Sequence, residues 1–180
     1  MEIWDAYTAE GEKLEFDLIR GEEIPQGAYH LAAEIYTVAE DEALLLTQRH
    51  PEKLWPLKWE ITGGSVLKGE TAEEGAQREL WEETGIRVSL EDLRPVYTEV
   101  SQKNRTIYHC FAVRVVQRQL RIRLQEGETV AWKFLPYPQW KDFLQGEEVA
   151  EPVRTRFLRH EDAIEKVLLE KPCSQTDDSV

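Results

Sequence analysis

The stretch from residue 64 to residue 86 constrains the fold of this chain more than any other part of the sequence. It begins as a glycine loop and continues into a short acidic segment of helix-forming residues. Thr71 followed by Glu74 is typical of a helix N-terminus, because the two residues can form a capping box. Gly85 supplies the left-handed residue that commonly follows a helix end. The pattern predicts a helix over residues 72–84.

Three acidic residues share one face of this predicted helix. Glu79, Glu82 and Glu83 are spaced i, i+3 and i+4, and they lie in the C-terminal half, where the helix dipole is negative. A helix built only for stability would carry Lys or Arg there. The conflict is explained if the face binds a hard cation, since Mg²⁺ and Mn²⁺ prefer carboxylate oxygens. The alternative is a solvated acidic face on an acidic protein.

The spacing of the residues in this stretch resembles the Nudix box. The positions that match are Gly64, Glu70, Arg78, Glu79, Leu80, Glu82, Glu83, Gly85 and Ile86. The resemblance implies that Glu79, Glu82 and Glu83 bind the divalent cations, Mg²⁺ or Mn²⁺, and that the Gly64 carbonyl adds a ligand. It also implies that Glu70 and Arg78 orient the loop and the helix, and that one of the helix glutamates acts as a base.

Some Nudix enzymes add a metal-binding acid from a loop across the site. Glu126 lies six residues before Trp132, as that acid does in those relatives, so it is the first candidate for a further ligand or base. Glu128 is the second candidate. For both residues the alternative is an exposed acid in a turn.

Composition limits the partners of this chain. A length of 180 residues fits one domain, predicted here over residues 1–172 with a disordered tail over 173–180. A net charge of −13 argues against a nucleic-acid polymer or an anionic membrane surface as main partner, but a small diphosphate remains compatible if metal ions supply positive charge. The sequence shows no signal peptide or transmembrane run and no disulfide framework, with Cys110 expected to be buried. We expect a cytoplasmic protein and leave homodimerisation open.

The order of predicted elements indicates the fold class. An N-terminal hairpin precedes strands over residues 29–38, 43–48 and 59–62, and the acidic helix follows. Further strand-like runs cover 86–88, 93–100, 105–116, 120–124 and 129–135, and helices are expected over 136–144 and 151–170. This order predicts an α/β/α sandwich around a mixed sheet, which is the Nudix fold.

The family resemblance implies Mg²⁺- or Mn²⁺-dependent hydrolysis of a diphosphate linkage in a nucleoside diphosphate derivative or a related organic diphosphate. The segments around Trp4 and His30 also resemble the Nudix subgroup related to isopentenyl diphosphate isomerase. Isomerase chemistry is disfavoured, because Gly63 occupies the position of the cysteine that it needs and no acid lies in residues 104–106. A non-catalytic, ligand-sensing Nudix domain is the third alternative, although such domains usually have an eroded box.

Overall fold

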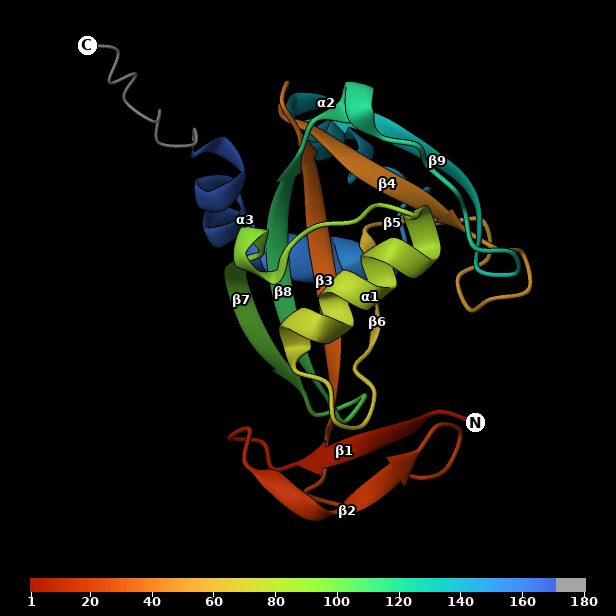
Figure 1. The fold of residues 1–180 in the computed structure, drawn as a ribbon, viewed down its shortest axis with the longest axis vertical. Helices are drawn as coiled ribbons and strands as arrows, with labels where there is room; N and C mark the ends of the chain where they lie inside the picture. Colours follow the sequence, from red (N-terminus) through yellow and green to blue (C-terminus); the bar gives the residue numbers. More distant parts are fainter. Residues whose placement is uncertain (171–180) are drawn as a thin grey trace.

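The computed structural model describes residues 1–170, whose centre is a seven-stranded mixed sheet (Figure 1). Strand β3 (His30–Ala39) lies in the middle of the sheet. It pairs in parallel with β8 (Thr106–Val115) and antiparallel with β4 (Ala43–Arg49) and β6 (Thr62–Ser65). The remaining strands of the sheet are β5 (Trp59–Glu60), β7 (Arg94–Ser101) and β9 (Thr129–Pro136).

The helices cover both faces of this sheet (Figure 1). Successive side chains of a strand point to opposite faces, so Ala33 and Ile35 of β3 pack against α1 (Ala72–Thr84), whereas Tyr36 and Val38 pack against the other side. That other side is closed by α2 (Tyr137–Phe143) and α3 (Glu151–Leu169), which bury a cluster around Trp140 and Phe157. The predicted α/β/α sandwich is confirmed.

Local capping explains why α1 begins and ends where it does. The Thr71 hydroxyl accepts the Glu74 backbone N–H at 3.2 Å, and the Glu74 carboxylate accepts the Thr71 N–H at 2.8 Å. At the other end Gly85 takes a φ of 75° and its N–H donates to the Trp81 carbonyl. The bounds of α1 are those expected from the sequence.

A separate hairpin, β1 (Ile3–Tyr7) and β2 (Lys13–Ile19), braces the loop that leads into α1. The buried carboxylate of Asp5 accepts the Gly69 N–H at 2.9 Å, and the Ile3 carbonyl accepts the Lys68 N–H at 2.9 Å. In Figure 1 the hairpin lies directly below this loop. The N-terminal hairpin was expected, but its support of the loop was not.

Two of the expected strands are wrong. Residues 86–88 run beside α1, where the Val88 carbonyl accepts the Gln77 amide at 2.7 Å and forms no ladder. Residues 120–124 alternate apolar and basic side chains, but the Arg123 N–H donates to the Thr84 carbonyl at the end of α1 and not to a neighbouring strand. In both segments the helix provides the backbone partners that a sheet would otherwise supply.

The other elements follow the sequence pattern closely. The single strand expected over 59–62 is divided at Ile61 into β5 and β6, and two short 3₁₀ helices cover Leu90–Asp92 and Gln117–Gln119. Cys110 is buried, as expected. None of the helices within residues 1–170 is long and apolar enough to cross a membrane. The tail predicted over 173–180 lies outside the described residues.

Candidate active site

The carboxylate of Glu79 lies against the backbone of Gly64. A Cβ atom placed on Gly64 would come within 2.6 Å of Glu79 Oε2, closer than atoms in real structures approach. A side chain at residue 64 would therefore displace the end of the Glu79 side chain, whereas the backbone of Gly64 has no unusual angle. Strand β6 and helix α1 thus bring Gly64 and Glu79, two matching positions of the motif, into contact.

Arg78 connects the loop to the acidic face. Its guanidinium donates to the Glu70 carboxylate at 2.8 and 3.1 Å and to the Ser65 carbonyl at 2.9 Å. It also contacts Glu79 at 2.7 Å and Glu82 at 3.1 Å. Burial alone would lower the pKa of Arg78, but its hydrogen bond with Glu70 and the charge of Glu79 outweigh this effect and raise the pKa.

The repulsion expected on the acidic face is therefore partly offset by Arg78. This residue neutralises Glu79 and Glu82 from within the same helix, whereas the sequence interpretation assigned it only an orienting role. Within residues 1–170 no three His, Cys, Asp or Glu side chains converge on a point that could hold a metal ion. A cation at this face has to compete with Arg78 for the oxygens of Glu79 and Glu82.

Glu83 is the most buried of the three helix glutamates. Its side chain is 4% exposed, and within residues 1–170 its buried Oε2 atom has no hydrogen-bond partner. Burial raises the pKa of Glu83 well above its usual range, and the charges of Glu60 and Glu79 raise it further. A buried carboxylate oxygen without a partner is costly, and a bound divalent cation would supply the missing partner.

Two basic residues outside the motif lie close enough to act on Glu83. The positive charges of Lys53 and Arg49 both lower its pKa, against the larger effects of burial and of neighbouring acids. Arg49 forms an ion pair with Glu60 at 2.5 Å, and Lys53 forms one with Glu128. No local sequence pattern identified these pairs, because each joins residues from separate segments.

The structure places Glu126 in an exposed turn beside the C-terminal end of α1. The turn is held there because the Gln125 N–H donates to the Glu83 carbonyl at 3.4 Å, and the Thr129 hydroxyl donates to the same carbonyl at 3.4 Å. Within residues 1–170 Glu126 has no ion pair, whereas Glu128 is occupied by Lys53. Of the two acids, Glu126 is therefore the one whose carboxylate is free to bind a cation.

A cleft of about 760 Å³ opens beside the glycine loop. Its walls are formed by β6, the loop after β4, the β7–β8 turn and the first half of α3. Both Gly63 and Gly64 line it, together with the aromatic rings of Trp55 and Tyr108. Its size is that of a pocket for a small organic molecule, and one of its lining residues, Gly64, is in contact with Glu79.

The family model for the NUDIX domain matches residues 28–157, which is more than half of the chain. The chain belongs to the Nudix family. The family model starts after the β1–β2 hairpin, so the hairpin that supports the Nudix loop lies outside the matched region.

Individual relatives agree with this family. An uncharacterized Nudix hydrolase of Listeria monocytogenes is 36% identical over 100 residues, a match that spans 54% of this chain and only 59% of the relative. The crystal structure of DR0079 from Deinococcus radiodurans superposes with a TM-score of 0.70 at 18% identity, covering 88% of this chain and 99% of that one. The NUDIX domain of Shewanella oneidensis NrtR, solved with ADP ribose, superposes with a TM-score of 0.60 at 18% identity. This match covers 81% of this chain and 94% of that one. At these identities the two structures show the shared fold alone.

Proposed function

We propose that this chain is a Mg²⁺- or Mn²⁺-dependent hydrolase that cleaves the diphosphate linkage of a nucleoside diphosphate derivative or a related organic diphosphate. The observation that supports this best is the contact of Glu79 with Gly64 next to the buried, unpartnered oxygen of Glu83. Gly64 also lines a cleft large enough for a small organic substrate, so the acidic face of α1 lies beside this cleft.

The residues that would hold the cations are the three helix glutamates, the Gly64 carbonyl and Glu126. Bound divalent cations would neutralise the phosphate oxygens and lower the pKa of the attacking water. Glu79 and Gly64 are in contact, and the hydrogen bonds around Gln125 support the location of Glu126 near Glu83. The donors are carboxylate and carbonyl oxygens, which suit Mg²⁺ and Mn²⁺.

The remaining groups of the site act by position and by proton transfer. Arg78 and Glu70 fix the glycine loop to α1 through four hydrogen-bonding contacts that include the Ser65 carbonyl. One of the helix glutamates accepts the proton of the attacking water. The diphosphate lies at the Gly63–Gly64 end of the cleft, and the rest of the substrate extends toward Trp55 and Tyr108.

The geometry gives no support to isomerase chemistry. A Cβ atom on Gly63 would lie 2.5 Å from the Ala33 carbonyl oxygen, so the cysteine that isomerisation needs cannot be accommodated there without a shift of the backbone. His30 stacks on Trp4 with ring centroids 4.3 Å apart, and its two nitrogens contact the Leu31 carbonyl and the Thr106 hydroxyl. His30 therefore has a structural role here. The subgroup resemblance itself stays a prediction.

A hydrolysis screen in which the products are separated by chromatography tests the proposed function. Purified protein is incubated with nucleotide sugars, ADP-ribose, dinucleotides, (d)NTPs and prenyl diphosphates, each with Mg²⁺, with Mn²⁺ and with EDTA. ADP-ribose is included first because a domain of the same fold has been solved with it. Metal-dependent hydrolysis of at least one compound is expected. Binding without turnover would instead favour a ligand-sensing domain, and dimethylallyl diphosphate formed from isopentenyl diphosphate would favour an isomerase.

A further inference from the structure

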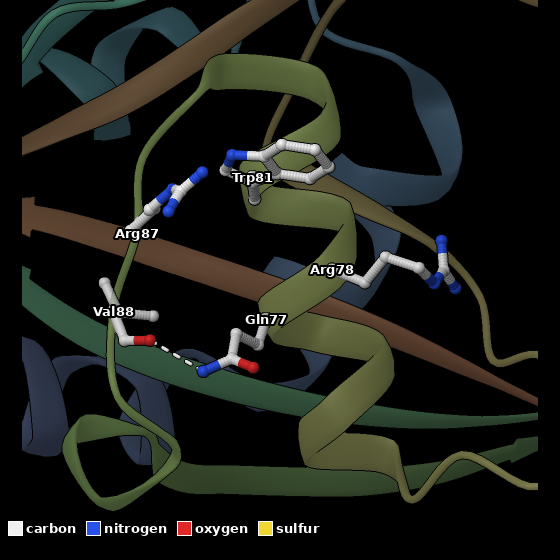
Figure 2. A pocket seen from close by; sticks show the side chains of 5 residues that line it. All are labelled: Gln77, Arg78, Trp81, Arg87 and Val88. Carbon is white, nitrogen blue, oxygen red and sulfur yellow. Dashed lines mark hydrogen bonds between the residues drawn. The ribbon is translucent and has the colours of Figure 1, made fainter.

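A second concave site lies on the opposite flank of α1 from the acidic face. This hollow, of about 400 Å³, is lined by Gln77, Arg78, Trp81, Arg87 and Val88 (Figure 2). It shares no lining residue with the cleft described above. Figure 2 shows the Arg78 guanidinium pointing away from the other four side chains, toward the side where it contacts Glu70 and Glu79. The hollow is therefore separate from the predicted metal ligands.

Backbone contacts with α1 fix the walls of the hollow. The Gln77 amide donates to the Val88 carbonyl at 2.7 Å and holds the segment after the helix alongside it. On the other side, the Arg123 N–H donates to the Thr84 carbonyl at 2.8 Å, and its Cβ packs close to Gly85. Both segments that carry arginine side chains to Trp81 are thus anchored to the helix before any ligand binds.

Two guanidinium groups flank the indole of Trp81. The Arg87 guanidinium lies 5.6 Å from the ring centroid and that of Arg123 lies 6.0 Å away. Figure 2 shows Arg87 and Trp81 pointing toward one another, with the indole nitrogen on the Arg87 side. Trp81 is 38% exposed, so its ring remains accessible. The Arg87 guanidinium and the Trp81 ring both line the hollow.

Neither arginine is neutralised by an acid in the part of the chain that the structure describes. Within residues 1–170 no carboxylate lies within 4 Å of a nitrogen of Arg87 or Arg123, whereas Arg20, Arg49, Arg78, Arg156 and Arg159 all have such partners. Within residues 1–170 the same holds for Arg94, Arg105, Arg114, Arg118, Arg121 and Arg154, so what distinguishes Arg87 and Arg123 is their shared position beside the Trp81 ring. An anion from solution would satisfy them.

We propose that this hollow binds a small aromatic anion, with its phosphate or carboxylate on Arg87 and its ring against Trp81. The guanidinium fork matches the oxygens of either anion, and an indole favours a flat ring. The volume suits a ligand of mononucleotide size. A longer polyanion is disfavoured by the net charge of −13. The proposal is independent of the proposed hydrolase function, because the hollow uses none of the acidic residues.

Indole NMR signals test this site directly. The protein contains six tryptophans, so ¹⁵N-tryptophan labelling gives a small set of indole signals, and Trp81→Phe identifies the one from Trp81. The labelled protein is titrated in EDTA with AMP, with adenosine and with inorganic phosphate. We expect AMP to shift the Trp81 signal saturably, and adenosine and phosphate each to act more weakly, since each supplies only half of the contacts.

Matched arginine variants show whether the charge matters. Arg87→Ala should weaken AMP binding by about tenfold, the effect of losing one charged hydrogen-bonding partner. Arg20→Ala removes an equal charge from the distant hairpin and should leave the titration unchanged. The signals of the other indoles report whether each variant is folded.

Three results would overturn the proposal. The first is a Trp81 signal that does not move with AMP up to about 10 mM, where even weak millimolar binding is detectable. The second is an AMP titration that is the same in Arg87→Ala as in the unmodified protein. The third is a shift confined to the signals of other tryptophans, because it would place AMP in the cleft or elsewhere.

Discussion

The carboxylate of Glu79 packs so closely on Gly64 that a Cβ atom at residue 64 would displace the end of the Glu79 side chain. The pair joins β6 to the middle of α1, and both residues are ones that the family resemblance assigns to the metal site. Gly64 has no positive φ, so the close contact at this position is with the Glu79 carboxylate and not a matter of backbone conformation.

Replacing Gly64 by alanine should therefore displace Glu79. We expect Gly64→Ala to weaken Mn²⁺ binding by about 10-fold or more, the usual effect of misorienting metal ligands, as measured by EPR titration of free Mn²⁺. Gly146→Ala is the control, because its Cβ would meet nothing closer than the Phe143 carbonyl oxygen at 3.4 Å. Equal Mn²⁺ affinity in the two variants would show that the Glu79 position does not matter for metal binding.

Glu83→Gln should stabilise the metal-free protein. Burial raises the pKa of Glu83, so ionisation of this carboxyl group destabilises the folded protein. The destabilisation is absent below the pKa of the unfolded chain, near 4.5, and it increases as the pH rises toward the higher pKa of the folded protein. In EDTA at pH 8 the Tm of the variant should exceed that of the unmodified protein by at least about 2 °C. The difference should vanish near pH 4.

The matched control for this experiment is Glu73→Gln, which removes a charge from the exposed first turn of the same helix. A negative charge there interacts favourably with the helix dipole, so its removal should not raise the Tm. If Glu83→Gln lowers the Tm at pH 8 as well, the carboxylate has a favourable partner that the structure does not show, and the argument for a cation at Glu83 loses its basis.

Glu126 should matter more for catalysis than Glu128. If Glu126 is a ligand or a base, Glu126→Gln should reduce kcat by about 10²-fold or more. Glu128→Gln should have little effect, since Glu128 is held by Lys53. Steady-state kinetics on a substrate from the screen measure both variants. A large loss in Glu128→Gln together with normal turnover in Glu126→Gln would reverse the assignment.

His30 should make the protein sensitive to acid. Burial lowers the pKa of His30 from 6.5 to about 4, so the unfolded chain binds a proton that the folded one excludes, and stability is lost as pH falls below 6.5. Between pH 6.5 and 4 the free energy of unfolding should fall by up to about 3 kcal/mol more than in His30→Phe, which keeps a ring on Trp4. Urea titrations at several pH values measure this, and parallel pH profiles would contradict it.

The parts of the fold that could be predicted from sequence are those fixed by local interactions. The bounds of α1 follow from Thr71, Glu74 and Gly85, whose caps involve residues within one turn. The face shared by Glu79, Glu82 and Glu83 follows from helix geometry alone. The long strands β3 and β8 follow from their runs of β-branched and aromatic residues.

The features that were missed depend on contacts between distant segments. Leu120 and Ile122 pack into the core, and their alternation with arginines mimics a strand, but the backbone bonds to the end of α1. The Arg49–Glu60 and Lys53–Glu128 pairs become visible only once β4, β5 and β9 lie side by side. The contact of Asp5 with Gly69 likewise requires the position of the N-terminal hairpin.

The measurement that tests the central claim most directly is metal-dependent hydrolysis by the unmodified protein and by Glu82→Gln. Glu82 is half-exposed and contacts Arg78, so the variant should fold normally. We expect the unmodified protein to cleave at least one organic diphosphate only when Mg²⁺ or Mn²⁺ is present, and Glu82→Gln to lose activity by about 10²-fold or more, as for the loss of a metal ligand or base. Equal activity in both proteins, or activity that persists in EDTA, would contradict the assignment of this helix face as the catalytic metal site.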